Sequence, residues 1–126
     1  MIMKKLMSLA MLVASMSAVS AMAKEDCKDP RSQMAMNICS GQDYKRADAT
    51  LNKSYKELVA NLERDRRQKL KQVQIAWIKY RDLQCEFDSS RYDGGSMESL
   101  VHSSCLTRIT EQRNKDLEAM LKEASM

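Results

Sequence analysis

Residues that interrupt helices are scarce in this chain of 126 residues, which contains three glycines and one proline. Turn-rich β architectures need glycine and proline at short intervals, and collagen-like or low-complexity chains need far more of both. Charged residues make up 30% of the chain and hydrophobic residues 44%, a composition that favours folding over disorder. The sequence therefore predicts a small all-α protein with a single domain.

The first 23 residues have the pattern of a signal peptide. Lys4 and Lys5 precede an uncharged apolar run over residues 6–19, and Ala21-Met22-Ala23 is a small-x-small cleavage pattern. The apolar run is shorter than the roughly 20 residues that a membrane-spanning helix needs. We therefore expect bacterial export with removal of this segment, which leaves a periplasmic or secreted domain of residues 24–126 with no stable membrane insertion.

Loss of the signal peptide also changes the charge of the chain. Removing Lys4 and Lys5 lowers the formal net charge from +4 to +2. Such a small excess of basic residues argues against a nucleic-acid partner. The basic run over residues 64–71 lacks interleaved aromatic residues, so we expect a solvated bend there and not a nucleic-acid site.

Apolar residues recur every three or four positions along three segments, as they do on one face of a helix. The predicted faces are Ala47, Leu51, Tyr55, Leu58 and Leu62; then Leu70, Val73, Trp77 and Tyr80, widened by Ile78; then Val101, Cys105, Ile109, Leu117, Met120 and Leu121. Asp29-Pro30 predicts a further short helix that ends near Cys39, before Ser40-Gly41. The expected fold is a small disulfide-stapled bundle of this short N-terminal helix and three longer helices, with a turn at residues 63–69. The alternative is one continuous helix over residues 43–87, since the run between the two apolar faces contains neither glycine nor proline.

All four cysteines lie in the exported part of the chain: Cys27, Cys39, Cys85 and Cys105. An even number in an exported protein indicates two disulfide bonds, and the lack of a C-x-x-C pair argues against a metal site. A helix over residues 30–39 would hold Cys39 too far from Cys27, because bonded Cα atoms lie within about 7 Å. We therefore expect Cys39–Cys85 with Cys27–Cys105; the alternative is Cys27–Cys85 with Cys39–Cys105.

Polar residues beside the predicted core are expected to join helices. Asp48 and Asn52 lie one turn apart, and Arg81 and Asp82 follow Tyr80 on the next helix. We predict that these four residues form a buried or half-buried network of ion pairs and hydrogen bonds.

No arrangement of residues in the sequence indicates catalysis. His102 is the only histidine, and it is accompanied neither by a nucleophile motif nor by a spaced pair of carboxylates in apolar surroundings. We therefore expect no enzymatic activity, no cofactor and no metal.

Several of these residues belong to a pattern that extends over the exported chain. It comprises Ala47-Asp48-x-x-Leu51-Asn52-x-x-Tyr55, Gln74-x-x-Trp77-x-x-Tyr80-Arg81-Asp82-x-x-Cys85, Gly94-Gly95-Ser96, Cys105 and Thr110-x-x-Arg113-x-x-x-Leu117. This pattern resembles the LprI-type lysozyme-inhibitor family, and the resemblance extends from Cys27 to Leu121. It implies an exported, helical, disulfide-bonded protein that inhibits lysozyme by direct protein contact.

The composition marks one clear loop, at residues 90–96. Within it we expect the partner-binding residues to be Tyr92, Asp93, Gly94, Gly95 and Ser96. The glycines would let the loop enter a groove, Asp93 and Ser96 would hydrogen-bond the partner, and Tyr92 would anchor it. Alternatively, the glycines serve only to start the last helix.

The predicted function is inhibition of lysozyme or another cell-wall hydrolase by a protein–protein contact. One alternative is a periplasmic immunity protein against a delivered toxin. The other is an envelope stress or chaperone-like protein without a single target.

Overall fold

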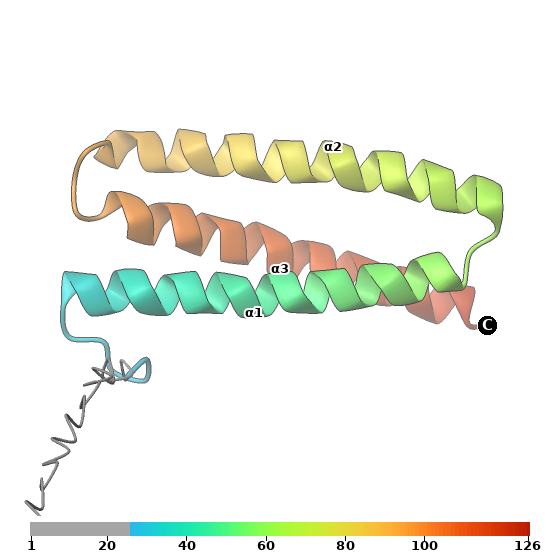
Figure 1. Ribbon diagram of the computed structural model, residues 1–126, viewed down its shortest axis with the longest axis horizontal. Coiled ribbons are helices and arrows are strands. Elements are labelled where there is room, and N and C mark those ends of the chain that lie inside the picture. Colours follow the sequence, from blue (N-terminus) through green and yellow to red (C-terminus); the bar gives the residue numbers. More distant parts are fainter. Residues whose placement is uncertain (1–25) are drawn as a thin grey trace, which may run out of the picture.

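A computed structural model describes residues 26–126, and within that range it contains helices and no strand. The three long helices are α1 (Gln33–Ala60), α2 (Arg64–Ser89) and α3 (Glu98–Ala124), and a short 3-10 helix, η1 (Ser90–Tyr92), follows α2. α1 and α3 run in one direction and α2 runs in the opposite direction (Figure 1). The expected all-α, disulfide-stapled bundle is confirmed. The predicted signal peptide lies outside the described residues.

α1 is one continuous helix, although the sequence predicted a short helix and a separate second one. Ser40 does not end the helix, because its hydroxyl donates to the carbonyl oxygen of Asn37 at 2.9 Å. Gly41 lies within the helix as well, where a glycine costs about 1 kcal/mol relative to alanine. The packing of this 28-residue helix outweighs that cost. The bundle therefore has three long helices, without the additional short one.

A turn separates α1 from α2, but it is shorter than the predicted turn at residues 63–69. It occupies residues 61–63, where the backbone N–H of Asn61 donates to the carbonyl oxygen of Leu58 at 3.0 Å. The charged run that follows belongs to α2, because arginine, lysine and glutamine are good helix formers.

The bundle has two ends, which differ in what they contain (Figure 1). We call the end with the connection between α2 and α3 (residues 90–97) the loop pole; the first turns of α1 and α3 also lie there. The other end, with the turn between α1 and α2 and the last turn of α3, is the turn pole. α1 packs most extensively on α3, whereas α2 packs on α3 and touches α1 at few points.

The core consists of two hydrophobic clusters. One contains Leu51, Leu58, Leu70 and Leu117, and the other contains Cys85, Cys105, Leu106 and Ile109. Trp77 packs against both clusters and so joins them.

α2 presents a different face to the core from the one that its apolar spacing predicted. Gln74 and Arg81 are buried, whereas Val73 and Tyr80 are 52% and 57% exposed. The predicted core positions of Val73 and Tyr80 are therefore wrong. The helix is rotated so that the guanidinium of Arg81 reaches aromatic rings and carboxylates on the inside, where its charge is compensated.

Both disulfides lie toward the loop pole, but their pairing differs from the predicted one. Cys27 is bonded to Cys39, with 5.4 Å between the Cα atoms, and Cys85 is bonded to Cys105, with 5.5 Å. The expected Cys39–Cys85 and Cys27–Cys105 bonds are therefore wrong, and so is the alternative pairing.

The start of α1 explains why Cys27 reaches Cys39. The helix begins at Gln33, and the side chain of Ser32 caps it by accepting a hydrogen bond from the N–H of Ala35 at 3.0 Å. Residues 27–32 are consequently not helical. Five extended residues span about 17 Å, which is enough for this segment to fold back over the roughly 9 Å rise from Gln33 to Cys39.

Candidate functional site

The tryptophan motif of α2 is built around one side of the helix. Trp77, Arg81 and Cys85 follow one another at intervals of four residues and face the other helices, whereas Tyr80 faces solvent. Residues four apart lie one above the other on a helix. The spacing of this motif therefore serves the packing of α2 against the bundle.

Arg81 connects α2 to α1. Its guanidinium lies 5.1 Å from the ring centre of Trp77 and 5.5 Å from that of Tyr44. Its Nε donates to Asp82 at 2.9 Å, and its Nη1 lies 3.8 Å from Asp48 Oδ1. Asn52 in turn donates to Asp48 at 3.4 Å. The structure thus brings together the four polar residues Asp48, Asn52, Arg81 and Asp82, with Arg81 buried and Asp82 half-exposed.

A second buried arginine, Arg113 of α3, lies on the same tryptophan. Its guanidinium is 5.9 Å from the ring centre of Trp77, and its Nε donates to Gln74 Oε1 at 3.1 Å. Burial lowers the pKa of Arg113, and the nearby carboxylate of Asp116 acts in the opposite direction. Gln74 and Arg113 were not predicted as site residues, although both belong to the family motif: Gln74 lies three residues before Trp77, and Arg113 three residues after Thr110.

Tyr44 is a titratable group beside Arg81 and the carboxylates of Asp48 and Asp82. Burial raises the pKa of its hydroxyl above the ordinary value of 10.0; the cation Arg81 lowers it, and the carboxylates Asp48 and Asp82 raise it. Because the raised pKa favours the neutral phenol in the folded state, this contribution to stability is present below pH 10 and is lost as the pH rises through the folded pKa.

We therefore expect Tyr44→Phe to reduce the alkaline loss of stability. The free energy of unfolding of the unsubstituted protein should fall more steeply above about pH 10 than that of the variant, because phenylalanine cannot ionise. Urea titrations at a series of pH values measure the two curves. Parallel curves above the ordinary tyrosine pKa would show that Tyr44 ionises equally easily in the folded and unfolded chain.

The loop at residues 92–96 is exposed but well fixed. Gly94 adopts a φ of 75°, in the region that favours glycine, and its N–H donates to the carboxylate of Glu98 at 3.0 Å. The N–H of Gly95 donates to the carbonyl oxygen of Tyr92 at 2.8 Å. Asn37 of α1 donates its side-chain N–H to the carbonyl oxygen of Ser96 at 3.0 Å. The loop is thus tied to two helices and presents one conformation to a partner.

A shallow hollow of about 670 Å³ lies beside this loop. Among the residues that line it are Asn37, Glu86, Asp93, Ser96, Glu98 and His102. Asp93 and Ser96 come from the predicted loop, whereas Glu86 and Glu98 were not predicted as site residues. Glu98 lies four residues after Gly94, whereas Glu86 is eight residues before it, so only the packing of the helices brings both to the hollow. The side chains that line it are polar or charged, which suits hydrogen bonds and ion pairs to a protein partner.

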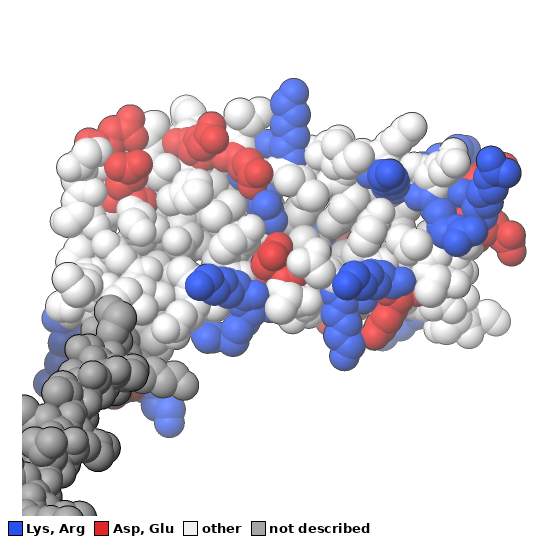
Figure 2. Space-filling model, viewed as in Figure 1, with Lys and Arg blue, Asp and Glu red and all other residues white. Residues whose placement is uncertain are grey.

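Charge is separated between the two ends of α2 (Figure 2). Toward the loop pole, residues 82–98 contain five carboxylates, Asp82, Glu86, Asp88, Asp93 and Glu98, and one basic residue, Arg91. Toward the turn pole, residues 63–71 contain five basic residues and two acidic ones. The small net charge of the chain therefore conceals an acidic end and a basic end.

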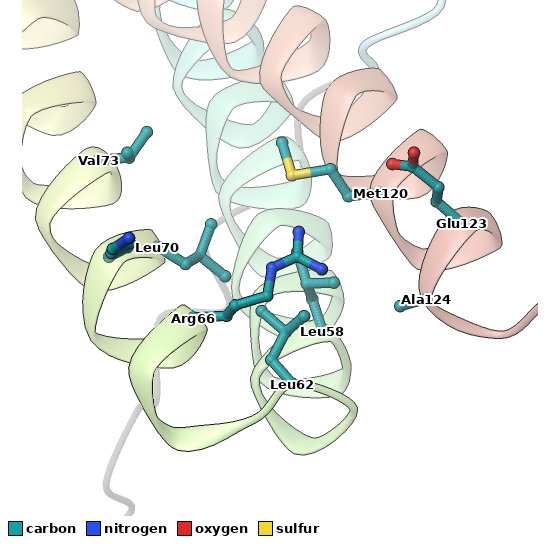
Figure 3. Close-up of a pocket in the computed structure, with 9 residues that line it drawn as sticks. Leu58, Leu62, Arg66, Leu70, Val73, Met120, Glu123 and Ala124 are labelled. Atoms are coloured by element: carbon teal, nitrogen blue, oxygen red, sulfur yellow. The ribbon is translucent and has the colours of Figure 1, made fainter.

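The turn pole carries an apolar groove of about 390 Å³ between α2 and α3 (Figure 3). Its apolar lining consists of Leu58, Leu62, Leu70, Val73, Met120 and Ala124. Arg66, Lys69 and Glu123 supply its charged groups. We call it the turn-pole groove; no site was predicted at this end of the bundle.

Comparison with known proteins identifies the family. The family profile described as "Lysozyme inhibitor LprI" matches residues 23–117, which include all four cysteines and the tryptophan motif. The chain belongs to the LprI family. The predicted resemblance is confirmed, and this is a family of inhibitors and not of enzymes.

One curated relative of this LprI-family protein is similar over nearly its whole length. It is described as uncharacterized protein R02472 of Rhizobium meliloti (strain 1021), with 37% identity over 131 residues, 93% of this chain and 94% of the relative. No solved structure gives a significant match.

The described part of this LprI-family protein contains no group of three or more histidine, cysteine or carboxylate side chains placed to hold a metal ion. None of the helices in residues 26–126 is long and apolar enough to cross a membrane.

Proposed function

We propose that this LprI-family protein is an exported inhibitor of a lysozyme or a related peptidoglycan-cleaving enzyme, acting by direct contact between the two proteins. Family membership supports the class of activity, since the matching profile is described as a lysozyme inhibitor. The acidic loop pole supports the mode of binding. It is the observation that connects the family to a particular surface of this chain.

The loop pole offers what a basic hydrolase would need in a binding partner. Five carboxylates within residues 82–98 attract cationic groups, and the hollow beside the loop receives them. Tyr92 provides a partly exposed aromatic ring next to Asp93, the arrangement of an anchor with a charged neighbour. The hydrogen bonds of Gly94 and Gly95 hold the loop in advance, which reduces the entropy lost on binding.

A net charge of +2 after export would not by itself steer the protein toward a basic enzyme. The separation of charge along α2 reduces this difficulty, because its loop-pole end is acidic and its basic run, residues 63–71, lies at the other end (Figure 2). Screening over about 8–10 Å at physiological salt makes the local charge more important than the total. We thus assign the partner contact to the Tyr92–Ser96 loop with Glu86 and Glu98 beside it.

The function is tested by lysis of a bacterial cell-wall suspension with lysozyme. The oxidised, exported protein should slow the loss of turbidity in a concentration-dependent way. In the double variant Glu86→Lys with Asp93→Lys, the concentration for half-inhibition should rise about tenfold or more, because two of the three carboxylates that line the hollow are replaced by cations.

Glu118→Lys provides the matched control. Glu118 is an exposed carboxylate on α3 outside the loop pole, so its reversal should leave inhibition unchanged. Unchanged lysis at a large molar excess of the unsubstituted protein would reject the proposed function. Equal inhibition by the double variant and the control would retain the function but reject the loop pole as the contact.

A further inference from the structure

The turn-pole groove combines buried apolar residues with a charged rim. Leu58 and Leu70 are its most buried side chains, at 1% and 8% exposed, and Val73 lies at its edge, at 52% exposed. Residues of α1, α2 and α3 all line it, so it is a hollow between three helices and not the outer face of one. Its volume of about 390 Å³ falls in the range of roughly 300–1,000 Å³ that is typical of pockets for small ligands.

Two cations lie at the opening of the groove on the α2 side. Arg66 and Lys69 are exposed and lie about one turn apart on α2, and the Arg66 side chain extends into the space between α2 and α3 (Figure 3). Within residues 26–126, all the ion pairs involve other residues. One carboxylate, that of Glu123 on α3, also lines the groove, so its charged groups sum to +1. The cations at the opening are therefore free to pair with an anion.

This combination fits a ligand with two parts. The apolar side chains remove a hydrocarbon chain from water, and a guanidinium with an ammonium beside it pairs with an anionic head group. A carboxylate suits the head position better than a phosphate monoester, whose charge of about −1.5 to −2 near neutral pH would be repelled more strongly by Glu123. The volume is near the lower end of the range for ligand pockets, so it admits one acyl chain and not the two chains of a phospholipid.

We propose that the turn-pole groove binds one fatty acid, with its acyl chain among the leucines and Met120 and its carboxylate held by Arg66 and Lys69. Docking of this pole on a membrane would instead need apolar side chains that project outward, whereas the leucines of the groove are buried or half-buried. The groove and the loop pole lie at opposite ends of the bundle (Figure 1). Fatty-acid binding therefore goes beyond the proposed inhibition and does not depend on it.

Isothermal titration calorimetry with dodecanoate, kept below its micellar concentration, tests the site on the oxidised, exported protein. We expect one molecule per chain and a dissociation constant of about 100 μM or lower, the scale on which a single acyl chain leaves water for a membrane. Val73→Glu should raise this constant about tenfold or more, because it places a carboxylate at the edge of the groove. Ile75→Glu is the control, since Ile75 is 59% exposed on the same helix but does not line the groove.

The role of the cations is tested by the double variant Arg66→Glu with Lys69→Glu. It should weaken dodecanoate binding about tenfold or more. The matched control, Arg67→Glu with Lys71→Glu, changes the net charge equally at positions that do not line the groove, and it should weaken binding less than about threefold. Dodecyl maltoside has the same chain and an uncharged head, so its affinity should be the same in both double variants. Circular dichroism melts confirm that each variant is folded.

Three outcomes overturn the proposal. They are no binding of dodecanoate up to its micellar concentration, an equal loss of binding in a groove variant and its control, and equal effects of the charge reversal on dodecanoate and dodecyl maltoside. Binding to phosphatidylglycerol vesicles without saturable binding of dodecanoate would also overturn it, by showing that the turn pole docks on a membrane and does not take up a single chain.

Discussion

Replacing Trp77 with alanine is expected to lower the free energy of unfolding by about 3–5 kcal/mol, the range for removing a large aromatic side chain from a core. The ring packs against both hydrophobic clusters, so its loss separates them. It also leaves the guanidinium groups of Arg81 and Arg113 without the aromatic face on which they lie, at 5.1 and 5.9 Å from the ring centre. Both effects act in the same direction.

Chemical denaturation followed by far-ultraviolet circular dichroism measures this loss, because the substitution removes the only tryptophan. Ile75→Ala is the matched control on the same helix. Ile75 is 59% exposed, so its truncation should change the free energy of unfolding by less than about 0.5 kcal/mol. Similar losses in the two variants would mean that Trp77 does not connect the clusters. Trp77→Leu keeps an apolar side chain but removes the ring. If packing dominates, its loss of free energy of unfolding should lie between those of Trp77→Ala and Ile75→Ala. If the arginine contacts dominate, its loss should be close to that of Trp77→Ala.

Removing the Cys85–Cys105 bond by the double change Cys85→Ala with Cys105→Ala is expected to cost about 3 kcal/mol. The bond closes a chain segment with a sequence separation of 20, and restricting the unfolded chain over such a segment stabilises the fold by roughly that amount. Both cysteines belong to the cluster near the loop pole, and Cys85 is fully buried. The thermal midpoint should fall accordingly, and the loop pole should become more mobile in hydrogen exchange.

The double change Cys27→Ala with Cys39→Ala should cost less, below about 2 kcal/mol. Residues 26–32 are not helical, and all but the half-buried Pro30 are exposed, so this segment regains freedom in the folded protein as well as in the unfolded one when the bond is lost. An equal loss in both double variants would contradict this view of the N-terminal segment.

Trypsin cleaves the chain between each pair of successive cysteines, so every cysteine lies in a different peptide and the disulfide pairing can be checked directly. Under non-reducing conditions, the peptide of residues 82–91 should remain joined to that of residues 92–108, and the peptide containing Cys27 should be joined to residues 32–45. A link between residues 32–45 and 82–91 would instead restore the Cys39–Cys85 pairing that the sequence analysis favoured.

A single helix boundary accounts for the wrong prediction of the disulfide pairing. Placing the start of α1 at Pro30 instead of Gln33 made the Cys27–Cys39 bond too long and so excluded the correct pairing. Both Asp29-Pro30 and Ser32 are good starts for a helix, and local preference does not distinguish them. Two interactions together select the later start. One is the hydrogen bond from the N–H of Ala35 to the Ser32 side chain, and the other is the disulfide between Cys27 and Cys39.

The orientation of α2 was a second point at which local pattern was insufficient. Val73 and Tyr80 continue the same spacing as Leu70 and Trp77, so an apolar count assigns them all to the core. Arg81 is charged and was expected only beside the core, yet it is buried between the rings of Tyr44 and Trp77. This rotation leaves Val73 and Tyr80 exposed to solvent.

The candidate site was partly predictable, since its loop is marked by two adjacent glycines. Gly94 requires its positive φ, and that preference is local to the residue. The hollow beside the loop was not predictable, because it also needs Asn37 from α1 and Glu86 from the end of α2. These residues are far from the loop in sequence, and only the packing of the helices brings them to it.

By itself, the sequence determined the helical class, the number of disulfides and the family, because helix-forming composition, apolar spacing and motif residues are properties of short segments. The tertiary structure alone decided which cysteines pair, which side of α2 is buried and where the acidic and basic ends lie. The physical reason is that a small rotation or a shift of a helix start changes local energies little. It changes every contact with residues far along the chain, and those contacts decide between the alternatives.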